Sequence, residues 1–128
     1  MTSASEHGNN QAADLVILSA RPDFWEQHLP ALRAGGLKIL LTDSYEKTAA
    51  AAKQGSLRLV LIDLPYSFDS LGDSVRRVQA MRPGLQAAVV SHFDSDDRAE
   101  ALQGLNVFLT LPRHPDEMDI KVLLNKLR

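Results

Sequence analysis

The feature that most constrains the fold of this chain is a series of short, continuous apolar runs separated by stretches of helical character. The run from Leu15 to Leu18 contains no polar residue. A strand buried on both faces of a parallel sheet has such a sequence, whereas a strand with one wet face alternates between apolar and polar residues. Similar runs recur along the chain. The expected strands are 15–18, 37–41, 57–62, 85–90 and 107–109.

The segments between these runs carry the start and stop signals of helices. We expect the first helix at 23–34, with a kink or a shifted start at Pro30, and the second at 45–54. The other helices are expected to begin at residues suited to a cap or a first turn: Asp69 or Ser70, Ser95 and Pro115. Strands that alternate with helices predict a doubly wound α/β domain, with a parallel sheet and helices on both faces.

Composition limits the class of protein. The chain has 128 residues and is 45% hydrophobic, which suits one domain, expected at 14–128. Residues 1–13 are polar, without the apolar core of a signal peptide, and are expected to form a disordered tail. The absence of cysteine favours a cytoplasmic protein. A net charge of -2 indicates no nucleic-acid partner, and the apolar runs are too short for a membrane span.

In sheets of this kind, functional groups gather at the carboxyl ends of the strands. The residues expected at that edge are Ser19, Ala20, Arg21, Asp63, Ser91, His92 and Thr110 to Arg113. Asp63, Ser91 and His92 include the residue types of a catalytic triad. However, neighbours in a strand point to opposite faces, so Ser91 and His92 are poorly placed to share a proton. The histidines also lack metal-ligand spacing, and we expect no enzymatic activity.

The stretch from Gly104 to Pro112 contains a glycine, an aromatic residue and a proline, and Asp63 follows the apolar pair Leu61-Ile62. These segments resemble the fifth-strand signature and the phosphoacceptor segment of the receiver domains of bacterial response regulators, the CheY-like domains. The resemblance implies a flavodoxin-like fold with strand order 2-1-3-4-5. It also places Ser91 and Phe108 at the switch positions and makes Pro112 a candidate for a cis peptide bond.

The chain departs from this family at the positions that handle charge. The family has two acidic residues after the first strand, which hold Mg²⁺, where this chain has Ser19 and Ala20. It has a lysine facing the phosphoryl group where this chain has Leu111. Mg²⁺ prefers oxygen ligands that include carboxylates, and phosphoryl transfer depends on charge neutralisation. We therefore expect weak or absent Mg²⁺ binding, no cofactor and no useful phosphorylation of Asp63.

A lone carboxylate at a half-buried strand end needs a partner. Arg21 is the expected ion-pair partner of Asp63, and Arg113 and His92 are the next candidates. Trp25 has two interpretations: an anchor for a protein partner, or a residue packed against the last helix.

The resemblance predicts a degenerate pseudo-receiver that acts in signal transduction by protein–protein interaction, independently of phosphorylation. Its partner would be a kinase, an output protein or a second copy of the chain, bound at the face formed by the fourth helix, fifth strand and fifth helix. The residues expected on that face are Ala101, Val107, Leu109, Arg113, Asp119 and Lys126.

Two alternatives remain at this point. One is an atypical receiver that is still phosphorylated on Asp63. The other is a ligand-binding module, in which a neutral pocket around Ser19, Ala20 and Leu111 holds a small apolar molecule.

Overall fold

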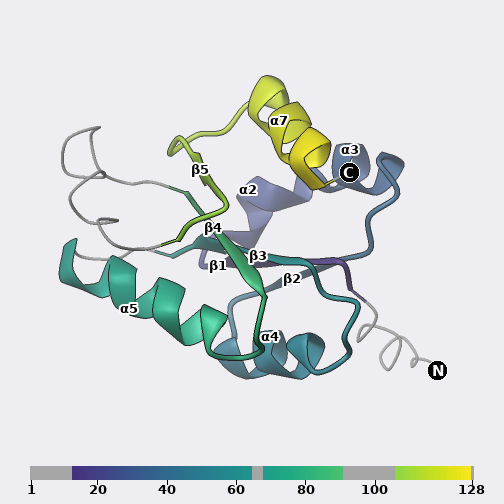
Figure 1. Ribbon diagram of the computed structural model, residues 1–128. Coiled ribbons are helices and arrows are strands. Elements are labelled where there is room, and N and C mark those ends of the chain that lie inside the picture. Colours follow the sequence, from purple (N-terminus) through teal and green to yellow (C-terminus); the bar gives the residue numbers. More distant parts are fainter. Residues whose placement is uncertain (1–12, 65–67, 91–105, 128) are drawn as a thin grey trace.

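A parallel sheet lies at the centre of the molecule (Figure 1). The computed structural model describes residues 13–64, 68–90 and 106–127. Within them the strands are β1 (Leu15–Ser19), β2 (Ile39–Thr42), β3 (Leu59–Asp63), β4 (Gln86–Val90) and β5 (Leu109–Leu111). The sheet has five strands, all parallel, in the order β2-β1-β3-β4-β5. This is the predicted flavodoxin-like α/β arrangement, and the predicted strand order is confirmed.

The helices cover both faces of the sheet, as predicted. Figure 1 shows one layer above the sheet and another below it. The upper layer contains α2 (Pro22–Glu26), α3 (Leu29–Ala34) and α7 (Glu117–Leu127), and the lower layer contains α4 (Tyr45–Ala52) and α5 (Phe68–Gln79). Successive residues of β1 accordingly belong to different hydrophobic clusters. Leu15 and Ile17 pack with the upper layer, and Val16 and Leu18 pack with the lower layer.

The apolar runs are explained by this double coverage. Every residue of β1 and of β3 is buried, and each of these strands has a partner on both sides. The edge strand β2 keeps three of its four residues only half-buried. The continuous runs therefore reflect burial from above and below together with pairing on both edges.

The predicted helix at 23–34 is divided into α2 and α3. Pro30 occupies the first turn of α3, where its missing N–H costs no helical hydrogen bond. The break places Trp25 and Leu29 in the upper core. The chain then leaves α3 through Gly36, whose φ of 92° is a conformation that favours glycine.

Two predicted boundaries in the C-terminal part are wrong. The fifth strand was expected at 107–109 but lies at Leu109–Leu111, because Ala88 pairs with Leu109 and Val90 with Leu111. This register buries Leu111 in the upper core. The last helix begins at Glu117 instead of Pro115.

The start of α7 is determined by two reciprocal hydrogen bonds. The backbone N–H of Asp119 donates to Asp116 Oδ1 at 3.1 Å, and the backbone N–H of Asp116 donates to Asp119 Oδ2 at 2.9 Å. The first of these bonds lowers the pKa of the Asp116 carboxyl from its ordinary value. The ionised cap therefore stabilises α7 at neutral pH, and this contribution is lost as the pH falls through the lowered pKa.

Other expectations are displaced or fall outside the described ranges. Helix α5 begins at Phe68, so Asp69 and Ser70 lie in its first turn and do not precede it. Ala13 was assigned to the tail but is 3% exposed. Residues 1–12 and the Ser95 cap lie outside the described residues. Among the described helices, none is both long enough and apolar enough to cross a bilayer.

Helix α4 offers a direct test of these local assignments. Ser44 precedes it, and its hydroxyl oxygen accepts a hydrogen bond from the backbone N–H of Lys47 at 3.1 Å. We expect Ser44→Ala to lower the free energy of unfolding by about 1 kcal/mol, because this N–H loses its partner. Ser44→Asp keeps an acceptor and serves as the control. Urea unfolding measures both variants, and equal losses would contradict the capping role.

Candidate functional site

The candidate site lies where β1 and β3 end side by side. Ser19 and Asp63 are paired in the register of these two strands, and each is 1% exposed. The Ser19 hydroxyl donates a hydrogen bond to Asp63 Oδ2 at 3.0 Å. Two neighbouring parallel strands thus bring a hydroxyl and a carboxylate together at the carboxyl edge of the sheet, where parallel α/β sheets place functional groups.

Two further donors reach the same carboxylate oxygen. Arg21 Nε lies 2.7 Å from Asp63 Oδ2, which forms the ion pair expected from the sequence. Trp25 Nε1 donates to this oxygen at 2.6 Å, and the tryptophan is fully buried. A hydroxyl, a guanidinium and an indole therefore converge on one atom. Hydrogen bonds to an ionised acceptor are short and strong, and this set compensates the cost of burying a carboxylate.

Arg21 also connects the site to the last helix. Its Nη2 donates to the carbonyl oxygen of Arg113 at 2.6 Å, in the segment between β5 and α7. Its backbone N–H donates to Ser19 Oγ at 3.0 Å. The guanidinium carbon lies 4.3 Å from the centre of the Phe24 ring, a cation–π contact. The Arg21 side chain thus connects the end of β1, the end of β3 and the segment that leads into α7.

Aromatic rings surround this network on the side of α2. Phe24 and Trp25 meet edge to face, with ring centres 5.2 Å apart. His28 contacts both rings, and His114 lies 6.5 Å from Phe24. These rings keep water away from the indole and from one face of the guanidinium. Charge-assisted bonds are stronger in such an environment than in water.

The residues at the site do not fit a Mg²⁺ centre. Asp63 is the carboxylate buried at the ends of β1 and β3, and its Oδ2 already accepts from a cation and two neutral donors. The Ser19 hydroxyl donates a hydrogen bond to that carboxylate, and Ala20 contributes an exposed methyl group. Within the described residues, no group of three or more His, Cys, Asp or Glu could hold a metal ion.

The other predicted site residues lie in different parts of the structure. Leu111 is 2% exposed and packs in the upper core, and Ser19 is equally inaccessible, so neither offers a surface for a ligand from solvent. Phe108 is half-buried just before β5, and its ring lies 5.8 Å from Lys126 Nζ. Arg113 contributes its carbonyl to the network. Ser91 and His92 lie outside the described residues.

One expectation needs correction, and the structure decides between the two interpretations of Trp25. Pro112 was a candidate for a cis peptide bond, but the described chain contains no cis peptide. Pro112 is exposed, so no packing offsets the preference of about 0.5–1 kcal/mol for the trans form. Trp25 cannot be an anchor for a partner, because it has no exposed surface. It belongs to the same cluster as Ile120 and Leu123 of α7, in agreement with the other interpretation.

The hydrogen bond from Trp25 to Asp63 was not foreseen. A signal for it exists in the sequence, because a buried indole N–H needs an acceptor and Trp25 lies one helical turn beyond Arg21. No protein-family model, curated protein or solved structure matches this chain, so no relative provides a precedent for the network.

The two members of the ion pair should respond differently to substitution. Arg21→Gln leaves a carboxylate buried without its cation, and we expect a loss of about 3 kcal/mol in the free energy of unfolding. Asp63→Asn leaves the guanidinium, which is 28% exposed and can turn toward water, so we expect a smaller loss of about 1–2 kcal/mol. Urea unfolding measures both losses, and the fluorescence of Trp25, the chain's only tryptophan, follows the transition.

Arg76→Gln is the matched control for these variants. Arg76 pairs with Asp73 at 3.0 Å, but both side chains are mostly exposed. Its substitution should change the free energy of unfolding by less than about 0.5 kcal/mol. A loss for Arg21→Gln no larger than that of this control would show that the buried pair does not support the fold.

Proposed function

We propose that this chain is a phosphorylation-independent variant of the receiver domain, and that it acts by binding a protein partner. The observation that carries the proposal is the set of three donors on Asp63 Oδ2, one of which is the Arg21 guanidinium. Receiver domains neutralise charge at this position with Mg²⁺ and a lysine. In this chain the charge of Asp63 is neutralised by a side chain of the protein itself, the guanidinium of Arg21.

This arrangement opposes phosphoryl transfer to Asp63. An attacking carboxylate oxygen needs an accessible lone pair and a path in line with the phosphoryl donor, and the donor needs its charge neutralised. Asp63 is 1% exposed, and the guanidinium of Arg21 binds both its carboxylate and the carbonyl oxygen of Arg113. A cation held at 2.7 Å also repels an approaching Mg²⁺.

The same contacts support a single, fixed conformation. Arg21 ties the buried carboxylate to the backbone just before α7, so the approach to this helix is held without any modification of Asp63. Receiver domains use the corresponding region to bind partners. We therefore propose that α7 and β5 present a constitutive interaction face.

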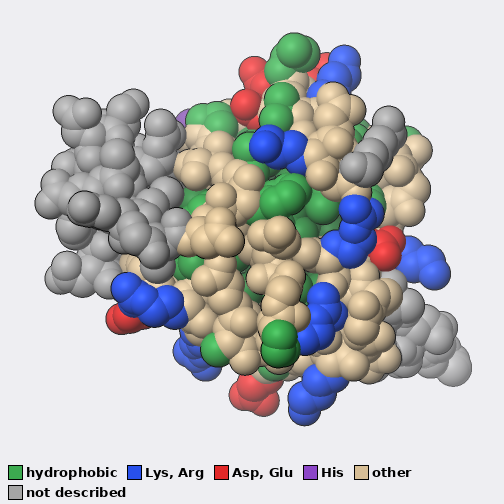
Figure 2. All heavy atoms as spheres, viewed as in Figure 1, with side chains coloured by type: hydrophobic (Ala, Val, Ile, Leu, Met, Phe, Trp, Pro, Cys, Tyr) green, Lys and Arg blue, Asp and Glu red, His purple; other side chains and the backbone are tan. Residues whose placement is uncertain are grey.

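The described part of this face is apolar with charged neighbours. Met118 and Val122 lie one turn apart on α7 and are 64% and 43% exposed. They are the large hydrophobic side chains that stand out as exposed among the described residues. Figure 2 shows hydrophobic atoms at the top of the molecule, over α7, next to acidic and basic groups. An apolar centre with a charged rim is the composition of many protein interfaces.

The other residues expected on this face differ in their surroundings, because Leu109 packs against the upper core whereas Val107 packs against the lower core. Val107 and Leu109 are half-buried near β5, Lys126 is exposed, and Asp119 is half-buried in the first turn of α7. Ala101 lies outside the described residues. The partner on this proposal is a kinase, an output protein or a second copy of the chain.

The first test concerns Asp63. We expect acetyl phosphate with Mg²⁺ to leave the intact mass unchanged, and beryllofluoride with Mg²⁺ to cause no chemical-shift changes centred on Asp63. Both expectations follow from the guanidinium on Oδ2. Asp63→Asn is the control for reaction elsewhere on the chain. A phosphoryl adduct on wild type that is absent from Asp63→Asn would establish the alternative, a receiver phosphorylated on Asp63.

The second test concerns the α7 face. The double change Met118→Glu with Val122→Glu should abolish capture of the partner from source cells. It should alter the free energy of unfolding by no more than about 0.5 kcal/mol, because both side chains are exposed. Ala50→Glu with Gln54→Glu adds the same charge at exposed positions in and after α4. If both double variants lose the partner to the same extent, the loss is not specific to the α7 face, and the interaction lies on another surface.

A further inference from the structure

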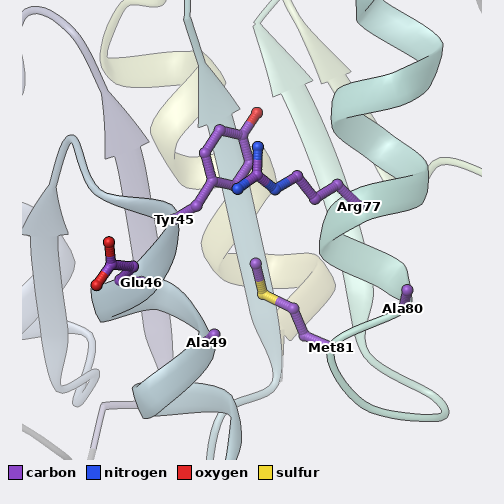
Figure 3. Close-up of a pocket in the computed structure, with 6 residues that line it drawn as sticks. All are labelled: Tyr45, Glu46, Ala49, Arg77, Ala80 and Met81. Atoms are coloured by element: carbon purple, nitrogen blue, oxygen red, sulfur yellow. The ribbon is translucent and has the colours of Figure 1, made fainter.

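A groove in the lower helix layer lies on the other side of the sheet from Asp63. It runs between α4 and α5, is open to solvent, and has a volume of about 290 Å³. This volume is close to the lower end of the range of roughly 300–1,000 Å³ found for small-molecule sites. Figure 3 shows the residues that line it: Tyr45, Glu46, Ala49, Arg77, Ala80 and Met81.

One end of the groove is formed by a stacked pair. The guanidinium carbon of Arg77 lies 3.9 Å from the centre of the Tyr45 ring, and Figure 3 shows the arginine reaching across from α5 to this ring. The Tyr45 hydroxyl donates to Ser74 Oγ at 3.1 Å, which fixes the ring against α5. Within the described chain, Arg77 forms no ion pair and no hydrogen bond. The result is a guanidinium of fixed plane with donors available to a ligand.

Such an arginine is suited to binding a carboxylate. Its planar fork matches the two oxygens of a carboxylate group, and stacking removes part of the side-chain entropy that binding would otherwise cost. A lysine would lack both properties. The stack therefore supplies a prepared anion contact at one end of an otherwise apolar groove.

The rest of the groove accepts an apolar group of modest size. Ala49 and Ala80 line it with small side chains, which leaves part of the space between the helices open. Figure 3 shows Met81 directed into the groove, and a thioether adapts well to the shape of an apolar ligand. Glu46 lies at the rim and points away from Arg77, and it would repel a second negative charge.

We propose that the α4–α5 groove binds a small monocarboxylate with an apolar body, whose carboxylate pairs with Arg77 and whose body packs between Ala49, Ala80 and Met81. This site is separate from the Asp63 network, and it stands or falls independently of the proposed function. A dianion is disfavoured by Glu46, and a neutral apolar molecule would leave the Arg77 donors unused.

Phenylacetate and its neutral analogue phenylacetamide test this site on the wild-type protein. Titration of ¹⁵N-labelled protein with phenylacetate should shift the amide signals of 45–49 and 77–81 and reach saturation. The amide should bind at least about tenfold more weakly, because it lacks the charge-assisted contact with Arg77. Equal affinities for the acid and the amide, or shifts scattered over the surface, would overturn the proposal.

Three variants locate the contacts. Arg77→Gln should weaken phenylacetate binding by about tenfold and leave phenylacetamide unchanged. Arg76→Gln removes the neighbouring arginine, which pairs with Asp73, and should change neither affinity. Ala80→Leu fills the groove and should abolish binding of both molecules. The proposal fails if Arg76→Gln matches Arg77→Gln, or if Ala80→Leu binds as wild type does.

Discussion

The convergence of three donors on Asp63 Oδ2 is the interaction on which the carboxyl edge of the sheet depends. An ionised carboxylate that is 1% exposed would cost several kcal/mol if it were left without partners. All three donors come from one short segment, 19–25, which contains the end of β1, the following loop and α2. The same hydrogen bonds therefore compensate the burial of Asp63 and hold the segment 19–25 in place. Arg21 also fixes the approach to α7, because it reaches the carbonyl of Arg113.

The compensation of the buried Asp63 charge by Arg21 is the basis of the proposed function. A receiver domain keeps its acidic site open, so that charge can be added and removed and the surface can respond. In this chain a cation of the protein itself compensates the buried charge, with an indole and a hydroxyl at the same atom. On our proposal the chain gives up reversible chemistry and keeps the geometry, which suits a module whose partner face is permanently available. Met118 and Val122 supply the exposed apolar part of this proposed face.

The two helix layers have different characters, although they cover the same sheet. The upper layer contains the polar network and packs a tryptophan against α7. In the lower layer α4 packs on the sheet through the small residues Ala51 and Ala52, and a groove remains between α4 and α5. Between them lie β1 and β3, which are buried along their full length. The groove and the Asp63 network are thus separated by the most tightly packed part of the molecule, and each can be altered by mutation without contact with the other.

The sequence by itself determined the class of fold, because continuous apolar runs that alternate with helical segments are typical of a parallel sheet covered on both faces. It also indicated that a buried Asp63 needs a partner, for which Arg21 was the first of three candidates, and the structure selects Arg21. It could not determine the position of β5, because residues 107–109 and 109–111 are both suitable strands, and pairing with β4 decides between them. Likewise, an indole N–H needs an acceptor, but only the seating of α2 against β3 decides that Trp25 reaches Asp63. The Arg77–Tyr45 stack depends on the spacing of two helices that are distant in sequence. In each case the missing information is a contact between segments, and local sequence carries no record of which distant segment will lie alongside.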